Sequence, residues 1–388
     1  MKNPAEKFEC LACGHTDFRM SNKPVGDLEE NGCPNCQGDM IVRENDDLPK
    51  RVKEIGETVE DVFNIWDFAM TKDQMEFRVD FEESAEESFE KFTEKIESLG
   101  YFSKIERENE EVKILIKKQP KIGESNVLIN IILFLATIGT TAGVAGYWGL
   151  YGPDLGKAVM FSFSILTILG AHELGHKFTA MKNNVKASWP YFLPVPHPWI
   201  GTFGAVIKNK SPIPNKNALV EIGASGPIIG YCMAIPFTII GLTLSSSGGG
   251  ASEFAQLPKP LIFYLLSHLA IGSFPPSFPP HPFAWAGFLG IFVTALNLLP
   301  TGQLDGGHIA RSLLNQETHF ILTRAIGFAL IISGLLWPGF AILGVLVLFF
   351  IGKPHPGPLN DISGLSTTHK ILAITAVVIL IISFPLPF

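Results

Sequence analysis

The chain has 388 residues, enough for two or three domains, and its net charge of −7 averages two unlike parts. Residues 1–130 hold 18 of the 30 basic and 30 of the 37 acidic residues, a net −12, whereas residues 131–388 carry +5. The second part contains nearly uncharged apolar runs of about 15–25 residues, the length at which a helix crosses ~30 Å of hydrocarbon. This pattern excludes a single soluble domain. It predicts an acidic soluble region followed by a multi-span α-helical membrane domain.

Two CxxC pairs lie near the N-terminus, which is polar and lacks the apolar core of a cleavable signal peptide. Cys10 and Cys13 form the first pair, and Cys33 and Cys36 form the second. Each pair can present two thiolates to one tetrahedral ion, and a segment this small needs such a crosslink. We therefore expect a structural zinc ribbon over residues 1–48. Two redox or disulfide pairs are the alternative, but no βαβ pattern surrounds them.

Residues 49–122 predict a small soluble α+β domain. A helix is expected at about 58–70, followed by a strand in which Met75, Phe77, Val79 and Phe81 alternate. A helix with apolar residues at helical spacing ends at Gly100, and two strands follow at 101–107 and 111–118. No catalytic constellation is present, so a structural or interaction role with a protein partner is expected. Nucleic acid is not an expected partner, because no basic cluster with interleaved aromatic residues occurs.

Residues 123–388 predict the membrane domain, with its core at about 127–312. We expect seven spans, near 127–147, 158–180, 218–244, 284–300, 319–336, 338–352 and 370–388. Lysine and arginine residues cluster in alternate loops, which the positive-inside rule places in the cytoplasm only if the apolar segment 260–272 does not cross. The chain is thus predicted to be a multi-pass protein of the cell membrane, surrounded by lipid, with cytoplasmic N-terminal domains.

The second apolar run contains the sequence HELGH. His172 and His176 are four residues apart, which places both imidazoles on one helix face, as a single metal ion requires. Glu173 can reach a metal-bound water without being a ligand and accept its proton. A chance match is the alternative. It is disfavoured because two histidines and a glutamate inside an apolar helix are costly unless they bind something.

A catalytic zinc needs a third protein ligand and an open fourth position. Asp305 is the only acidic residue from 254 to 316, and it follows Pro300, which ends a span. Gly306 and Gly307 allow a break in the helix and a close approach of backbone there. We therefore predict Asp305 as the third ligand of a catalytic zinc. His308 is the alternative.

HELGH together with NLLPTGQLDGG at 297–307 resembles the two signatures of the site-2 protease family of intramembrane metalloproteases. GTFGAVI at 201–207 also resembles archaeal and plastid members, and the resemblance covers roughly residues 127–310. It implies zinc ligation by His172, His176 and Asp305, and a general base at Glu173. It also implies that Asn297 holds the substrate or the tetrahedral oxyanion. The PDZ-like insertion and CBS pair of some members are not seen, so the resemblance does not extend to regulation.

Two glycine-containing segments have a physical interpretation of their own. Small and β-branched residues suit 201–207 to an extended strand that could pair with an unwound substrate, and Gly201, Thr202, Phe203 and Gly204 are the predicted substrate contacts. A plain interfacial loop is the alternative. The sequence GASGP at 223–227 is expected to let helices pack closely near the site.

The sequence as a whole predicts a zinc metalloendopeptidase that cuts a peptide bond within or near the transmembrane segment of a membrane-protein substrate. A zinc-binding membrane scaffold or metal transporter without proteolytic activity is the main alternative. A transporter would need further polar residues along a path through the bilayer, and the predicted spans contain almost none.

Overall fold

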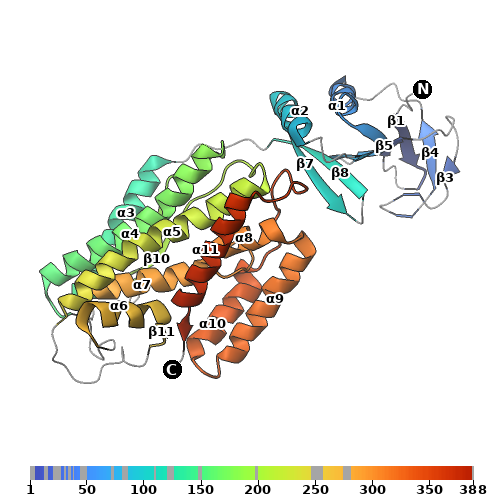
Figure 1. Cartoon of the computed structure of the whole chain (residues 1–388). Coiled ribbons are helices and arrows are strands. Elements are labelled where there is room, and N and C mark those ends of the chain that lie inside the picture. Colours follow the sequence, from blue (N-terminus) through green and yellow to red (C-terminus); the bar gives the residue numbers. More distant parts are fainter. Residues whose placement is uncertain are drawn as a thin grey trace. The chain divides into compact units, whose positions relative to one another are not determined.

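The computed structural model describes residues 5–12, 16–20, 28–29, 32–33, 36–37, 39–43, 50–70, 74–80, 86–108, 111–119, 126–146, 151–196, 200–245, 257–273 and 281–386. The chain divides into two compact units (Figure 1). The first unit comprises Met1–Lys121 together with Leu359–Ser363, and the second comprises Ile122–Pro358 and Gly364–Phe388. Each unit is described separately.

An eight-stranded antiparallel sheet forms the first unit, with the strand order β3-β4-β1-β2-β5-β6-β8-β7. The strands are β1 (Ala5–Cys10), β2 (Thr16–Met20), β3 (Leu28–Glu29), β4 (Met40–Arg43), β5 (Asn64–Met70), β6 (Gln74–Asp80), β7 (Tyr101–Glu108) and β8 (Glu111–Lys118). Helices α1 (Lys50–Glu60) and α2 (Glu86–Ser98) contact each other and contribute to one apolar core with β5–β8. The α+β class predicted for this region is therefore observed.

The prediction of a helix at about 58–70 is wrong. The chain instead forms α1 at Lys50–Glu60 and then strand β5 at Asn64–Met70. Val52, Ile55 and Val59 recur at helical spacing and are buried, which fixes α1 earlier in the chain. Residues 64–70 pair instead with β2 and β6, and this tertiary pairing outweighs an extension of the helix.

A segment distant in sequence also belongs to the first unit. The backbone N–H of Ile105 on β7 donates to the carbonyl of Leu359 at 2.8 Å, and Asp361 N–H donates to the carbonyl of Ile105 at 3.1 Å. Asn360 therefore lies opposite Ile105 in a parallel bridge, and Ile362 packs against the core. The chain returns from the second unit to complete the edge of this sheet.

Helices form the second unit. They are α3 (Val127–Gly146), α4 (Leu155–Lys182), α5 (Lys216–Thr243), α6 (Leu261–Ile271), α7 (Pro282–Asn297), α8 (Asp305–Leu313), α9 (Gln316–Ser333), α10 (Pro338–Leu346), the π-helical turn η3 (Val347–Ile351) and α11 (Thr367–Ser383). Two short sheets pair β9 (Tyr191–Pro194) with β10 (Thr202–Val206), and β11 (Lys259–Pro260) with β12 (Pro385–Leu386).

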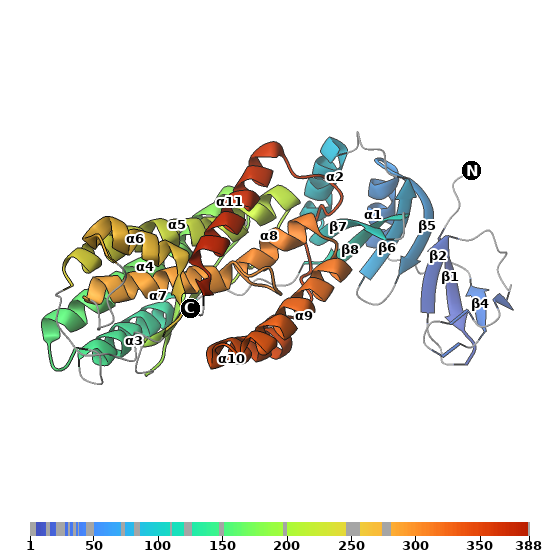
Figure 2. The ribbon, with the colours of Figure 1, turned by 60° about the horizontal axis from the view of Figure 1, so that its bottom comes forward.

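Helix α5 is the centre of the second unit and packs against α4, α6, α7, α8 and α11. The two longest helices, α4 and α5, begin at capping residues. Asp154 accepts a hydrogen bond from Lys157 N–H, and Asn215 accepts one from Ala218 N–H. Helices α3, α4 and α5 run alongside one another, whereas α9 and α10 form a pair beyond α8 (Figures 1 and 2).

Three helices among the described residues are long and apolar enough to cross a membrane: α3, α4 and α5. Helices α6, α7, α11 and the α10–η3 segment are apolar but shorter. With 11 residues, α6 rises only about 16 Å, which agrees with the expectation that this segment does not cross. The structure thus supports a multi-helix membrane domain, and the total of seven spans stays a prediction.

Candidate metal centre

The predicted metal ligands converge from two helices that are far apart in sequence. His172 and His176 lie one turn apart on α4, and their Nε2 atoms are 3.1 Å from each other. Asp305, the first residue of α8, places Oδ2 3.2 Å from His172 Nε2 and Oδ1 3.2 Å from His176 Nε2. In the described part of the chain, these three residues are the group whose ligand atoms lie close enough to hold one metal ion.

The carbonyl of Ile222 fixes the tautomer of His176. This oxygen can only accept a hydrogen bond, and it lies 2.7 Å from Nδ1, so Nδ1 carries the proton and Nε2 presents its lone pair to the other two residues. Two imidazole nitrogens and a carboxylate, with space beside them, match the donor set of an open catalytic zinc site. The residues present therefore fit zinc. The assignment of each as a ligand stays a prediction.

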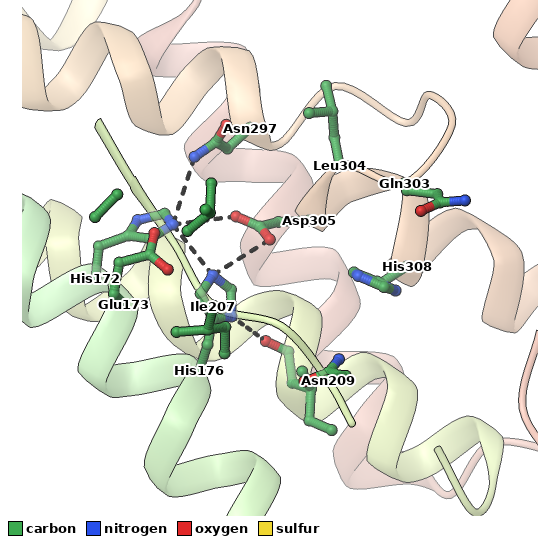
Figure 3. A pocket seen from close by; sticks show the side chains of 13 residues that line it. His172, Glu173, His176, Ile207, Asn209, Asn297, Gln303, Leu304, Asp305 and His308 are labelled. Atoms are coloured by element: carbon green, nitrogen blue, oxygen red, sulfur yellow. Dashed lines mark hydrogen bonds and ion pairs between the residues drawn. The ribbon is translucent and has the colours of Figure 1, made fainter. Parts of the chain in front are cut away.

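A cavity of about 210 Å³ opens beside the three donors (Figure 3). Glu173 lines it and is 7% exposed, and the backbone N–H of Ile207 faces its carboxylate. Asn297, the last residue of α7, also lines the cavity, with its Nδ2 3.4 Å from His172 Nε2. The structure thus brings the predicted base and the predicted oxyanion residue to the same cavity as the three donors.

Glycines of α5 allow this convergence. A Cβ atom on Gly226 would lie 2.1 Å from His176 Nε2, and one on Gly230 would lie 3.0 Å from His172 Cβ. A Cβ atom on Gly223 would lie 2.8 Å from the carbonyl oxygen of Asp305. All three donor residues therefore rest on one glycine-lined face of α5, which we call the glycine seam (Gly223, Gly226 and Gly230). The expectation of close helix packing at 223–227 is confirmed.

Strand β10 runs along the cavity, and the residues that line it follow the four predicted substrate contacts, which stay a prediction. The lining residues are Ala205, Val206 and Ile207, and Asn209 follows them. Gly201, Thr202, Phe203 and Gly204 do not line this cavity, although all four are described. They lie before the lining part of the strand, at an irregularity in the β9–β10 pairing between residues 202 and 205. Composition alone could not show which half of the strand reaches the metal site.

The predicted residues instead shape the hairpin. Gly201 has φ +73°, and a Cβ atom there would lie 2.7 Å from Thr141 Cα, so only glycine lets the hairpin lie directly on α3. Thr202 is buried, and its Oγ1 donates to the carbonyl of Leu193 and accepts from Gly204 N–H. Phe203 is 72% exposed and points away from the core. Gly201 and Thr202 therefore hold β10 in place.

His308 is the alternative ligand predicted from the sequence, whereas no sequence pattern singles out Gln303 or Leu304. All three line the cavity. His308 lies one turn after Asp305 on α8, and its ring stands on the other side of Asp305 from Glu173 (Figure 3). Its Nδ1 lies 2.7 Å from Nε2 of His355, a residue 47 positions later. The pairing of His308 with His355 had no signal in the sequence.

The fold and the site together define a class: a multi-helix membrane protein with a buried two-histidine, one-aspartate donor set and a neighbouring glutamate. Comparison with known proteins gives the family. The model described as "Peptidase family M50" matches residues 160–335, which include both halves of the donor set. This match and the curated relatives support the site-2 protease family, peptidase family M50, for this stretch of the chain.

Curated relatives of this chain include plant proteins. The chain is 30% identical to "Probable zinc metalloprotease EGY1, chloroplastic" of Oryza sativa subsp. japonica, over 60% of this chain and 41% of that protein. It is 29% identical to the Arabidopsis thaliana protein of the same name, over 66% of this chain and 52% of that protein. The matches thus span about half or less of the relatives' lengths. No solved structure matches the chain.

Proposed function

We propose that this chain is a zinc metalloendopeptidase that hydrolyses a peptide bond within or near the transmembrane segment of a membrane-protein substrate. The observation that carries this proposal is the cavity in which Glu173 faces three converged donors, while a strand runs along the same cavity. A bound zinc ion would lower the pKa of a water molecule and polarise the scissile carbonyl.

The protein's own residues supply the remaining chemistry. Glu173 accepts the proton of the attacking water and passes it to the leaving amine. The resemblance to the family implies that Asn297 holds the substrate or the tetrahedral oxyanion, and its amide Nδ2 lies at the cavity beside His172. The side chains of His172, Glu173 and His176 are all at least nine-tenths buried, so few water molecules compete with these interactions.

Strand β10 supports an extended substrate. Carbonyls inside a transmembrane helix are hydrogen-bonded and shielded, so a helix must unwind before it can be cut. The segment Ala205–Ile207 runs beside Glu173, and pairing with its backbone would hold an unwound segment extended at that carboxylate. Lysine-rich loops next to α4 and α5 favour a site near the cytoplasmic face, with the N-terminal unit also cytoplasmic.

The N-terminal cysteines are proposed to hold a second, structural zinc ion. Cys10 ends β1 and pairs with Met40, and Cys33 leads into the following turn, where Gln37 N–H donates to the Cys33 carbonyl. The structure describes Cys33 as buried and Cys36 as exposed, whereas Cys13 and the side chain of Cys10 lie outside the described residues. This backbone arrangement is compatible with two CxxC turns at one ion, and the domain would suit a protein partner.

The decisive experiment compares Glu173→Gln with the wild-type chain, both purified with zinc in detergent and mixed with single-span fusion substrates. Glu173→Gln should retain zinc and lose cleavage by about 10²–10⁴-fold, because the amide cannot accept the proton. Glu221→Gln is the matched control, since Glu221 lies on α5 outside the cavity and contacts Lys182. That control should still cut.

Two outcomes would count against the proposal. Cleavage at the wild-type rate by Glu173→Gln would remove Glu173 as the base. A wild-type chain that binds zinc but cuts none of the membrane proteins that it is co-expressed with would favour the zinc-binding scaffold. Mass spectrometry of uncut proteins that accumulate in cells expressing Glu173→Gln would identify the substrate directly.

A further inference from the structure

A chain of hydrogen bonds fixes the protonation pattern of two histidines beside the metal site. Gly357 N–H donates to His355 Nδ1 at 3.0 Å, so this nitrogen carries no proton. The neutral ring of His355 must then carry its proton on Nε2, which lies 2.7 Å from His308 Nδ1. His355 therefore donates to His308, and the one proton of the His308 ring lies on Nε2.

This deduction leaves His308 with a hydrogen-bond donor at the cavity. His308 lines the cavity, and no described residue accepts a hydrogen bond from its Nε2. With a proton on Nε2 and an accepted bond at Nδ1, the ring has no lone pair to offer a metal. The same pattern that excludes His308 as a ligand makes it a fixed N–H donor.

The surroundings hold this pair rigidly. His355 is 3% exposed, and Gly357 adopts φ +74° against the buried side chain of Arg311, where a Cβ atom would lie 2.5 Å from Nη2. His308 itself rests on the glycine seam, because a Cβ atom on Gly223 would lie 2.9 Å from its own Cβ. The donor is thus held in place before any substrate binds, which is the condition for effective stabilisation of a developing charge.

We propose that His308 is a second oxyanion donor of this site and that His355 is its positioning residue. This inference rests on the proposed function. Attack on a carbonyl places the incoming oxygen and the oxyanion at different corners of the tetrahedral carbon. The general base and the hydrogen-bond donor to the oxyanion must therefore lie on different sides of the predicted metal ligands. Glu173 and His308 do so (Figure 3). His308 donates a hydrogen bond throughout and transfers no proton.

Kinetics with paired variants test the donor. His308→Leu removes it, and His308→Gln keeps an N–H group at a similar reach. His308→Leu should lower kcat by about 10²–10³-fold with little change in KM, because the interaction forms only in the transition state. The kcat of His308→Gln should be at least tenfold higher than that of His308→Leu. Zinc content measured on the same samples should remain that of the wild type in both variants.

The histidine pair also has a spectroscopic signature independent of cleavage. In protein labelled with ¹⁵N-histidine, His308 Nε2 should give the resonance of a protonated ring nitrogen, and Nδ1 that of an unprotonated one. The assignment follows from the signals lost in His308→Gln. In His355→Leu the preference for this tautomer should weaken, with kcat reduced about tenfold and zinc content unchanged.

Several results would overturn the inference without touching the proposed function. One is a zinc-loaded His308→Leu variant that keeps the wild-type kcat. Another is a His308→Gln variant that is no more active than His308→Leu. The third is an NMR spectrum in which Nδ1 of His308 carries the proton. Loss of zinc in both His308 variants would instead make His308 a ligand. Failure of the wild-type chain to cut any substrate would reject the proposed function, while the NMR result would still report on the tautomer.

Discussion

Gly226→Ala is expected to disable the metal site through a single methyl group. The added Cβ would lie 2.1 Å from His176 Nε2, whereas ordinary contacts begin near 3.4 Å. The imidazole or one of the two helices must therefore move by about 1.3 Å, several times the tolerance of ~0.2 Å in a Zn–N bond. Overpacking of this kind costs about 1–3 kcal/mol. If the metal site absorbs that strain, zinc binding weakens by about 5- to 150-fold.

The assay is zinc content after dialysis against a graded chelator, measured alongside cleavage of a single-span substrate. His176→Ala defines the zinc content of a chain without the catalytic site, so the proposed ribbon zinc does not obscure the result. Gly139→Ala in α3 is the matched control, because nothing lies within 4 Å of its added Cβ. It should bind zinc and cut as the wild type does. Normal zinc affinity and normal cleavage in Gly226→Ala would refute the close approach of α4 and α5 at this seam.

Two further predictions concern strand β10 and the N-terminal cysteines. Thr202→Val removes the hydrogen bonds of Oγ1 to Leu193 and Gly204, worth about 0.5–1.5 kcal/mol each, so KM should rise roughly tenfold at unchanged zinc content. An unchanged KM would mean that β10 does not hold the substrate. Cys33→Ser should lower the total zinc by one ion per chain and leave the cavity zinc in place, as seen by metal analysis. Equal metal content in mutant and wild type would argue against a zinc ribbon.

The first unit shows which elements a local sequence pattern can predict. Its strands at 74–80, 101–108 and 111–118 follow from the alternation of apolar residues, which is a property of a single strand. The assignment at 58–70 failed, because pairing of β5 with β2 and β6 decides whether that segment is extended. Nothing in the sequence shows that Leu359–Ser363 completes the edge beside Ile105, since an edge strand's partner is set by the assembled sheet.

For the site, the sequence by itself determined which residues could form a zinc site. The spacing of His172 and His176 places both on one face of a helix. Asp305 is a lone acidic residue in an apolar stretch, where a carboxylate without a binding partner is energetically costly. The tertiary structure decided the geometry around them: which half of β10 lines the cavity, that glycines of α5 admit the imidazoles, and that Gly357 sets the proton on His308 through His355. Spacing within a helix is dictated by 3.6 residues per turn. Contacts between segments 40 to 130 residues apart depend on how the helices pack, which no local pattern encodes.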